Sequence, residues 1–338
     1  MQKVNWGIIG LGNIAKKFSE GFDLVNNAKI LAIASHDPYK LNLYKEKFNL
    51  KKTNCYINYE EMLENENVDI IYISLPNSLH YTWILKCIKK NKKVLVEKPA
   101  VLNFNEIENI DKILEKNFFF AEAFMYRFSP QIQVVIDIIQ ANEIGDILSI
   151  DSSFGVNLLT KKKFFLFRQK KKINLENRLF NKDLGGGCIL DLGCYPSSFS
   201  ILIASLSSGK IEKIKFSDNK KHFLSNGVEV DAQIGIKFNN NINAKIRCSF
   251  KNNYGKQSII IGNKGKIIIK DTWFGNEVIK IIENKEYVYK KNYKNIYSYE
   301  IENTSNAIIN GENTSKFPGM TFEETKLNMK ILDEWREN

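Results

Sequence analysis

An apolar stretch that runs into a glycine turn, VNWGIIGLGNIA at residues 4–15, is the feature that most constrains the fold of this chain. Its first part has the composition of a buried strand, and the turn has the spacing Gly10-x-Gly12-x-x-Ala15. The glycines allow a tight turn and a close approach of the backbone to a pyrophosphate, while the small Ala15 lets the next helix pack near the sheet. The stretch therefore predicts a phosphate-binding turn.

The context of the turn supports this interpretation. A helix is expected over residues 15–20, directly after the turn, and the exposed amides and dipole at its start favour a bound phosphate. A second strand is expected over residues 29–35, at the spacing of a dinucleotide-binding fold. A glycine turn alone can occur by chance, but the order of strand, turn, helix and strand argues against chance.

The length of 338 residues is too great for one ordinary core and suggests two domains. No uninterrupted apolar run approaches the roughly 20 residues that cross a bilayer. The first residues resemble a core strand rather than a signal peptide. We therefore expect a cytoplasmic protein that has no membrane partner.

Composition also limits the partners. The five cysteines are odd in number and scattered in apolar surroundings, which indicates reduced buried thiols. The three histidines are equally dispersed, so we predict no metal. A net charge of +11 would suit nucleic acid, but lysine, asparagine and isoleucine are frequent throughout. We interpret the lysines as solvated helix faces and expect no nucleic-acid partner.

The first part of the chain alternates strands and helices. After the second strand, helices are expected over 41–48, 59–65, 79–90 and 105–116, and strands over 68–75, 93–97 and 118–122. This alternation predicts a doubly wound parallel sheet of the Rossmann type, an α/β domain that covers residues 1–122.

The pattern changes after an amphipathic helix expected over 130–141. Strands of period two are expected over 147–156, 228–238, 242–250 and 258–270. They predict an α+β domain over 123–338, with an open, largely antiparallel sheet that has helices on one face. A Thr321-x-x-Glu324 capping box opens a last helix over 321–337, which we expect to pack back on the first domain.

Two of these strands carry apolar residues on alternate positions, and this alternation bears on assembly. These residues are Ile234, Ile236, Phe238, Ile246, Cys248 and Phe250. If helices cover only one face of the sheet, the other face needs a cover, so we predict a homodimer or homotetramer.

Ligands of open α/β sheets bind beyond the carboxyl ends of the strands. The segment LPNSLH at 75–80 and the segment VEKP at 96–99 follow strands there, as the glycine turn does. Lys98 stands directly before a proline, which fixes the direction of the chain, so we interpret it as a functional lysine.

The run GGGCILDLGCYP at 185–196 places Asp191 and Tyr195 four residues apart, on one face of a helix. From the residues alone, these two side chains are either functional or a buried cap and a core tyrosine. Both interpretations stay open at this point.

Together with Glu122-Ala-Phe-Met-Tyr-Arg127, these motifs in this order resemble the glucose-fructose oxidoreductase, inositol dehydrogenase and MocA family over nearly the whole chain. Tyr195 stands where inositol dehydrogenase-like members carry His, which resembles the branch of the dihydrodiol dehydrogenases and aldose 1-dehydrogenases. The resemblance implies a Rossmann domain, an open-sheet domain used for oligomerisation, and a cis peptide before Pro99. It also implies an NAD(P)-dependent oxidoreductase that acts on a sugar, a cyclic polyol or a diol.

The resemblance further implies catalytic roles. Oxidation of an alcohol needs a base for the hydroxyl proton while hydride leaves for the nicotinamide. Tyr195 is the implied base, and because a phenol titrates near pH ~10 it needs a nearby cation, which Lys98 would supply. Asp191 would orient the substrate hydroxyls or the lysine.

The resemblance assigns binding contacts as well. Substrate contacts fall on Arg127, Arg178, Asp191 and Tyr195. Cofactor contacts fall on Gly10, Gly12, Asn13, Ile14, Ser35, His36, Lys40, Leu75, Pro76, Asn77, His80, Glu97 and Lys98.

The choice of cofactor depends on the end of the second strand. Family members that prefer NADP often have Ser-Arg there, and this chain has Ser35-His36. An NAD site usually has an acid at the strand end, whereas Asp37 comes later. His36 and Lys40 could contact a 2′-phosphate, although neutral His is weaker than the fork of Arg. We expect NADP, with NAD as the alternative.

A non-catalytic NAD(P)-binding regulator or sensor of the same fold is the alternative function, and the presence of both Tyr195 and Lys98 argues against it. The substrate is not defined by these motifs. The segment 155–181 is basic and aromatic and could hold a phosphate or form a solvated flap. Its basic and aromatic residues include Phe164, Phe165, Phe167, Arg168 and Arg178.

Overall fold

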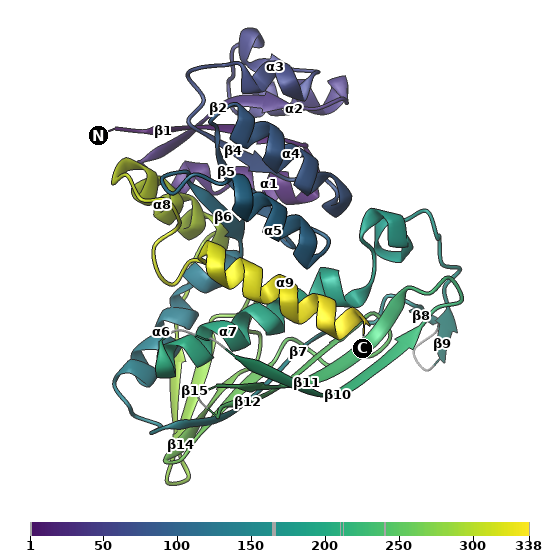
Figure 1. Cartoon of the computed structure of the whole chain (residues 1–338), viewed down its shortest axis with the longest axis vertical. Coiled ribbons are helices and arrows are strands. Elements are labelled where there is room, and N and C mark those ends of the chain that lie inside the picture. Colours follow the sequence, from purple (N-terminus) through teal and green to yellow (C-terminus); the bar gives the residue numbers. More distant parts are fainter. Residues whose placement is uncertain (1, 164–166, 210, 212, 240, 338) are drawn as a thin grey trace. The chain divides into compact units, whose positions relative to one another are not determined.

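The computed structural model describes residues 2–163, 167–209, 211, 213–239 and 241–337 (Figure 1). The chain forms two compact units. The first comprises Met1–Phe128 and Lys294–Lys326, and the second comprises Ser129–Tyr293 and Leu327–Asn338. Phe164 and Phe165 of the basic, aromatic segment lie outside the described residues.

The first unit is built on a six-stranded parallel sheet in the order β3-β2-β1-β4-β5-β6. The strands are β1 (Val4–Ile9), β2 (Ala28–Ala34), β3 (Cys55–Tyr56), β4 (Ile70–Ile73), β5 (Lys93–Glu97) and β6 (Phe120–Ala123). The helices between them are α1 (Asn13–Ser19), α2 (Pro38–Lys47), α3 (Tyr59–Leu63), α4 (Asn77–Lys89) and α5 (Phe104–Ile113). The predicted Rossmann domain is confirmed.

The composition of the strands explains this sheet. The residues of β4 are buried throughout, and β1 and β5 are nearly so. Strands that are apolar on both faces need layers on both faces, which helices supply in a parallel sheet. The strand order reverses between β1 and β4, and such a switch point is where α/β folds bind ligands.

A late helix, α8 (Ile296–Ile309), also belongs to the first unit. The Trp6 indole Nε1 donates to Ser305 Oγ over 3.1 Å, and Asn27 Nδ2 donates to the Glu302 carbonyl oxygen over 2.9 Å. These contacts join β1 and the segment before β2 to a helix almost 300 residues later in the chain. Only the tertiary structure brings them together.

The division of the chain differs from the single boundary that was expected after residue 122. The first unit continues to Phe128 through the short helical turn η3 (Met125–Phe128) and regains Lys294–Lys326. The last helix, α9 (Phe322–Glu337), is divided between the units after Lys326. Its capping box is confirmed, because the Thr321 amide donates to Glu324 Oε2 over 3.0 Å and the Glu324 amide donates to Thr321 Oγ1 over 3.2 Å.

The second unit contains an eight-stranded sheet in the order β10-β11-β12-β7-β13-β14-β15-β16. Only the β12–β7 pair is parallel among its described pairs. The strands are β7 (Ile147–Gly155), β10 (Ile214–Phe223), β11 (Glu229–Phe238), β12 (Asn243–Ser249), β13 (Ser258–Gly262), β14 (Gly265–Ile269), β15 (Glu277–Ile282) and β16 (Lys285–Lys290). A separate hairpin pairs β8 (Thr160–Lys163) with β9 (Phe167–Lys170).

Helices α6 (Pro130–Gln140) and α7 (Cys194–Ser208) lie against one face of the large sheet (Figure 1). The open, largely antiparallel sheet is confirmed. The single strand expected over 258–270 is instead the hairpin β13–β14, which turns at Asn263 and Lys264. A Cβ on Gly265 would lie 2.5 Å from the Ile281 carbonyl oxygen, so β14 approaches β15 closely only with glycine at this position.

The prediction that the alternating residues of β11 and β12 form an open face is wrong. Ile234, Ile236, Phe238, Ile246, Cys248 and Phe250 are at most 2% exposed within the single chain. They lie on the face that the unit itself covers. An alternating pattern shows that one face of a strand is buried, but it does not show what buries it.

One helical stretch, Lys182–Ser207, has the length and apolar composition of a membrane-spanning helix, although its apolar residues do not form one uninterrupted run. Of its apolar window, 83% is buried inside the chain. A core helix of a folded domain has this property too. The five cysteines are free thiols, and all except Cys55 are buried.

Candidate active site

The glycine turn after β1 has the geometry of a phosphate-binding turn. Gly10 has a positive φ of 85°, and a Cβ there would lie 2.9 Å from the Ser74 carbonyl oxygen and 2.8 Å from Leu75 Cδ2. Ser74 Oγ donates to the Gly10 carbonyl oxygen over 2.7 Å. Gly12 precedes α1 without a side-chain cap, and the space around its missing Cβ is open. This open cradle at a helix start fits a dinucleotide pyrophosphate.

His80 of α4 lies inside the protein rather than at a surface that could face a cofactor. Its ring is fully buried, with Nδ1 2.9 Å from the Pro99 carbonyl oxygen and Nε2 2.9 Å from the Leu75 carbonyl oxygen. A neutral ring can donate to one of these carbonyls at a time. His80 thus ties the loops after β4 and β5 together, a different role from the cofactor contact expected of it. Pro76 and Asn77 begin α4 beside it.

The loop after β5 carries Lys98, which is half-buried. Tyr72 Oη donates to Glu97 Oε1 over 2.5 Å, and the Lys98 amide donates to Glu97 Oε2 over 3.3 Å. Burial, with the charge of Glu97, raises the pKa of the Tyr72 phenol, so it stays a donor to this carboxylate. The Lys98–Pro99 peptide is cis, as the resemblance implies.

The end of β2 shows how Asp37 is used. Asp37 caps α2, with Oδ1 accepting from the Lys40 amide over 3.3 Å and Oδ2 lying 3.6 Å from Lys40 Nζ. The Asp37 amide donates to Ser35 Oγ over 3.1 Å. The exposed His36 ring packs on Tyr59 with centroids 4.1 Å apart. Asp37 is therefore engaged in the cap, whereas His36 and Lys40 are open to solvent.

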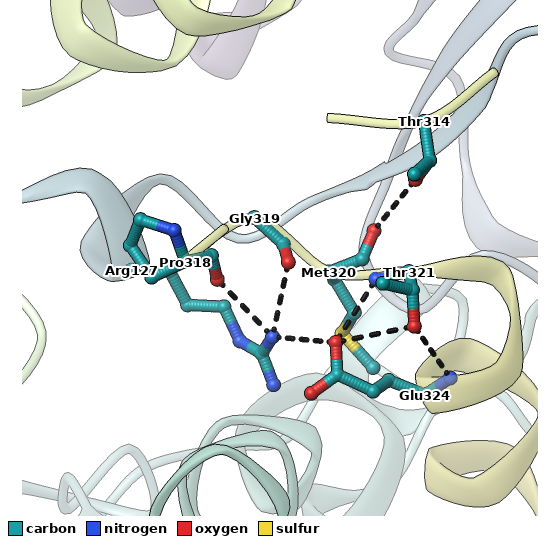
Figure 2. A network of polar contacts seen from close by, with 7 residues as sticks. All are labelled: Arg127, Thr314, Pro318, Gly319, Met320, Thr321 and Glu324. Carbon is teal, nitrogen blue, oxygen red and sulfur yellow. Dashed lines mark hydrogen bonds and ion pairs between the residues drawn. The ribbon is translucent and has the colours of Figure 1, made fainter. Parts of the chain in front are cut away.

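Arg127 holds a loop. Its guanidinium is fully buried, and Nη1 donates to Glu324 Oε2 over 3.0 Å and toward the carbonyl oxygens of Pro318 and Gly319 (Figure 2). The same Glu324 oxygen accepts from the Thr321 amide in the capping box. A buried cation needs a charged partner, and Arg127 receives one from α9. Its substrate contact stays a prediction.

In the second unit, Gly186 and Gly187 of the run 185–187 are required by close packing. A Cβ on Gly186 would lie 2.6 Å from the Asn181 carbonyl oxygen. Gly187 has a φ of 114°, and its Cβ would lie 2.2 Å from Glu229 Oε1. Glu229 is buried, and this burial raises its pKa. The glycines let the chain pass this carboxyl group and enter the helical segment that follows.

Asp191 and Tyr195 stand on that segment, as predicted. Asp191 lies in a π-helical turn, η6 (Ile189–Gly193), and Tyr195 lies in the first turn of α7. Such wide turns often occur at functional sites. Arg178 Nη1 lies 3.4 Å from Asp191 Oδ1, and Phe154 and Trp273 each lie 5.3 Å from the Tyr195 ring, centroid to centroid. The aromatic neighbours fix the plane of the phenol.

Two buried acids with clear structural contacts were not recognised from the sequence as site residues. Glu229 packs against Gly187, and Glu122 at the end of β6 accepts a hydrogen bond from the Ala100 amide over 2.9 Å. No local pattern distinguishes either from a surface glutamate, because their neighbours come from distant strands.

The comparisons with known proteins agree with this architecture. Residues 4–118 match the model of an oxidoreductase family with an NAD-binding Rossmann fold, GFO/IDH/MocA, and residues 132–268 match the C-terminal domain of that family. The chain belongs to the GFO/IDH/MocA family of oxidoreductases.

Several relatives span nearly the whole chain. Trans-1,2-dihydrobenzene-1,2-diol dehydrogenase from Xenopus tropicalis is 26% identical over 97% of this chain and 96% of its own length. The mouse protein of the same name is also 26% identical, over 99% of this chain and 96% of its own length. The fold resembles an aldose-aldose oxidoreductase from Caulobacter crescentus, with a TM-score of 0.85 and 19% identity over 99% of this chain and 96% of that chain. The fold also resembles a 3-ketoreductase from Actinomadura kijaniata in complex with NADP, with a TM-score of 0.80 and 21% identity over 98% of this chain and 96% of that chain.

The glycine geometry leads to a first prediction. Gly187→Ala and Gly227→Ala both force a positive φ on alanine, which costs roughly 1–3 kcal/mol of unfolding free energy. Only Gly187 adds a clash with a buried carboxyl group, worth about 1–3 kcal/mol more, because nothing lies within 4 Å of a Cβ at Gly227. Chemical denaturation of both variants should show the larger loss for Gly187→Ala. Equal losses would contradict the packing role.

Proposed function

We propose that this protein transfers hydride between a nicotinamide cofactor and a hydroxyl or carbonyl carbon of a sugar, a cyclic polyol or a diol. The main support for this function is that the glycine turn and Lys98 both follow strands at the carboxyl edge of one parallel sheet. The strands concerned, β1 and β5, flank β4 directly. A cofactor held by the turn at this edge would extend across the strand ends, where Lys98 stands.

Tyr195 is the proposed acid and base. Oxidation of an alcohol carbon requires removal of the hydroxyl proton, and the bound nicotinamide would supply the hydride chemistry. The phenol lies against Phe154 and Trp273, which hold its ring in one plane. Since a free phenol is protonated at neutral pH, the proposal needs the Lys98 ammonium to favour the phenolate.

Asp191 and Arg178 are the proposed substrate-orienting groups. Asp191 is mostly buried and Arg178 is 48% exposed, so the pair presents a carboxylate held by a cation. A carboxylate accepts hydrogen bonds from vicinal hydroxyls, which suits a polyol or diol. The names of the relatives supply the same substrate classes, since they describe a diol dehydrogenase and an aldose-aldose oxidoreductase.

This proposal leads to a prediction for Tyr195, measured with the substrate found by screening aldoses, inositols and diols against cofactor reduction. Tyr195→Phe removes only the hydroxyl and should lower kcat by about 10²–10⁴-fold, the range of general acid–base groups. Cofactor affinity should stay nearly unchanged. If the variant keeps more than about a tenth of the activity, Tyr195 is not the proton carrier.

Lys98→Met provides the companion measurement. Without the cation the pKa of the phenol should rise, so the residual activity should increase toward higher pH than in the unmodified enzyme. A pH–rate profile of unchanged shape would assign Lys98 a different role. A non-catalytic sensor would bind cofactor but reduce it with none of the screened substrates.

We propose NADP as the preferred cofactor, because Asp37 is engaged in capping α2 and in a 3.6 Å pair with Lys40, while the Lys40 side chain is 47% exposed and within reach of a ligand at the surface. Fluorescence titration should show tighter binding of NADPH than of NADH. Lys40→Ala should weaken NADPH binding several-fold and leave NADH binding unchanged, whereas the exposed Lys52→Ala serves as the control. NADH binding that is at least tenfold tighter would overturn the choice.

We also propose that the chain forms a homodimer or homotetramer through the face of the large sheet opposite α6 and α7. Ile259, Ile268, Ile279 and Val288 lie directly opposite one another on four neighbouring strands. Their strand neighbours Ile260, Ile267 and Val278 are fully buried on the other face. The row therefore lies on the outer face, where Val288 is 53% exposed, whereas Ile279 is only 8% exposed. The exposed part of this apolar stripe favours association.

Sedimentation tests this assembly. Val288→Lys places a charge on the stripe and should shift the protein toward the monomer. Phe223→Lys is the matched control, because Phe223 is 54% exposed on β10 at the far edge of the sheet and Val288 is 53% exposed. A monomeric unmodified protein at micromolar concentration would contradict the proposal.

A further inference from the structure

The backbone of the Lys98 turn is held from two sides by buried side chains. His80 of α4 places Nδ1 2.9 Å from the Pro99 carbonyl oxygen. From the other side, the Ala100 amide donates to Glu122 Oε1 over 2.9 Å. The two residues that follow Lys98 are therefore both fastened, by groups from elements on either side of β5 in the sequence.

Glu122 is an unusual group to hold a backbone amide. It lies on β6, where it pairs with Val96 of β5, and only 3% of it is exposed. Its second oxygen, Oε2, is buried as well, and the Thr325 hydroxyl also acts on this carboxyl group. A neutral side chain such as Gln would hold the same amide without the cost of burying a carboxylate. The hydrogen bond to the Ala100 amide therefore does not by itself explain a carboxylate at position 122.

The charged groups that act on Glu122 are Arg127 and Lys98. Arg127 is neutralised by its pair with Glu324. Burial raises the pKa of Glu122 to about 7, while the Ala100 amide, the Thr325 hydroxyl and the two cations lower it. The carboxyl group therefore changes charge in the neutral pH range, beside the turn that carries Lys98.

We propose that Glu122 is a positioning residue for Lys98: its carboxylate fixes the turn through the Ala100 amide and adds to the negative charge that Glu97 already places beside Lys98. This inference rests on the proposed function of Lys98. An ionised carboxylate accepts a stronger hydrogen bond than a neutral one, and its charge favours the ammonium form of a neighbouring lysine. As the pH falls through the neutral range, Glu122 gains a proton, the Ala100 hydrogen bond weakens and this support for the Lys98 ammonium is lost.

The Ala100 amide reports the first part of this coupling. In the full chain labelled with ¹⁵N-alanine, the Ala100 amide proton should titrate with a midpoint near pH 7 and lose this step in Glu122→Gln. Glu106→Gln is the matched control, because Glu106 Oε2 accepts the Leu102 amide over 2.8 Å in the same loop, and this variant should keep the step. A flat Ala100 titration in the unmodified protein, or a step that persists in Glu122→Gln, would overturn the proposal.

The reactivity of Lys98 reports the second part. Only the neutral amine is acylated, so the rate at which N-hydroxysuccinimidyl acetate modifies Lys98 at pH 8, followed by mass spectrometry, reflects its protonation. In Glu122→Gln this rate should rise several-fold, with no change at the distant Lys86 and no rise in Glu106→Gln. An unchanged rate would show that Glu122 does not support the Lys98 charge.

These measurements separate the two proposals, because neither requires a substrate. If no screened alcohol reduces the cofactor, the proposed function fails while a titrating Ala100 amide and a faster-reacting Lys98 still establish the coupling. If the Ala100 and Lys98 responses are absent while Tyr195→Phe loses activity as expected, the proposed function stands and the positioning role of Glu122 fails.

Discussion

The close approach of Gly10 to strand β4 is the constraint on which the arrangement of the first unit's strand ends depends. A side chain at this position would collide with the Ser74 carbonyl oxygen, and Ser74 in turn donates to the Gly10 carbonyl oxygen. From there, buried contacts continue across the sheet edge, through His80 to Pro99 and from the Ala100 amide to Glu122. The loops after β1, β4 and β5 are thus linked to one another and to β6.

This linkage explains why polar residues are buried beside apolar strands. Parallel strands end at one edge and leave loop carbonyls and amides that water reaches poorly, and each such group needs a partner. The side chains of Ser74, His80 and Glu122 provide partners without filling the space before the glycine turn. A rigid edge with an open cradle suits a cofactor that must be held in one orientation.

In the second unit, close packing around three glycines determines the arrangement of the segment that carries Asp191 and Tyr195. Glycines at 186 and 187 let the chain pass the buried Glu229, and Gly193 lies where a Cβ would come within 2.9 Å of Trp335. The wide turn η6 and the start of α7 are thereby packed tightly, and the rings of Phe154 and Trp273 lie against Tyr195. Gly186 and Gly193 are required by close packing, and Gly187 is required both by close packing and by its positive φ.

The sequence alone determined the glycine turn, the alternating strands and helices of the first unit, the antiparallel character of the second sheet and the Thr321 capping box, because each is a local pattern of turn chemistry or periodicity. The family resemblance added roles for Lys98 and Tyr195. The tertiary structure alone decided the roles of Arg127 and His80, which carry the same polar side chains as ligand-binding residues but lie against distant backbone carbonyls. It also decided that α8 joins the first unit and that Ile234 is covered within the chain. Local patterns specify which face of an element is apolar, whereas the partner of that face depends on contacts between residues far apart in the chain.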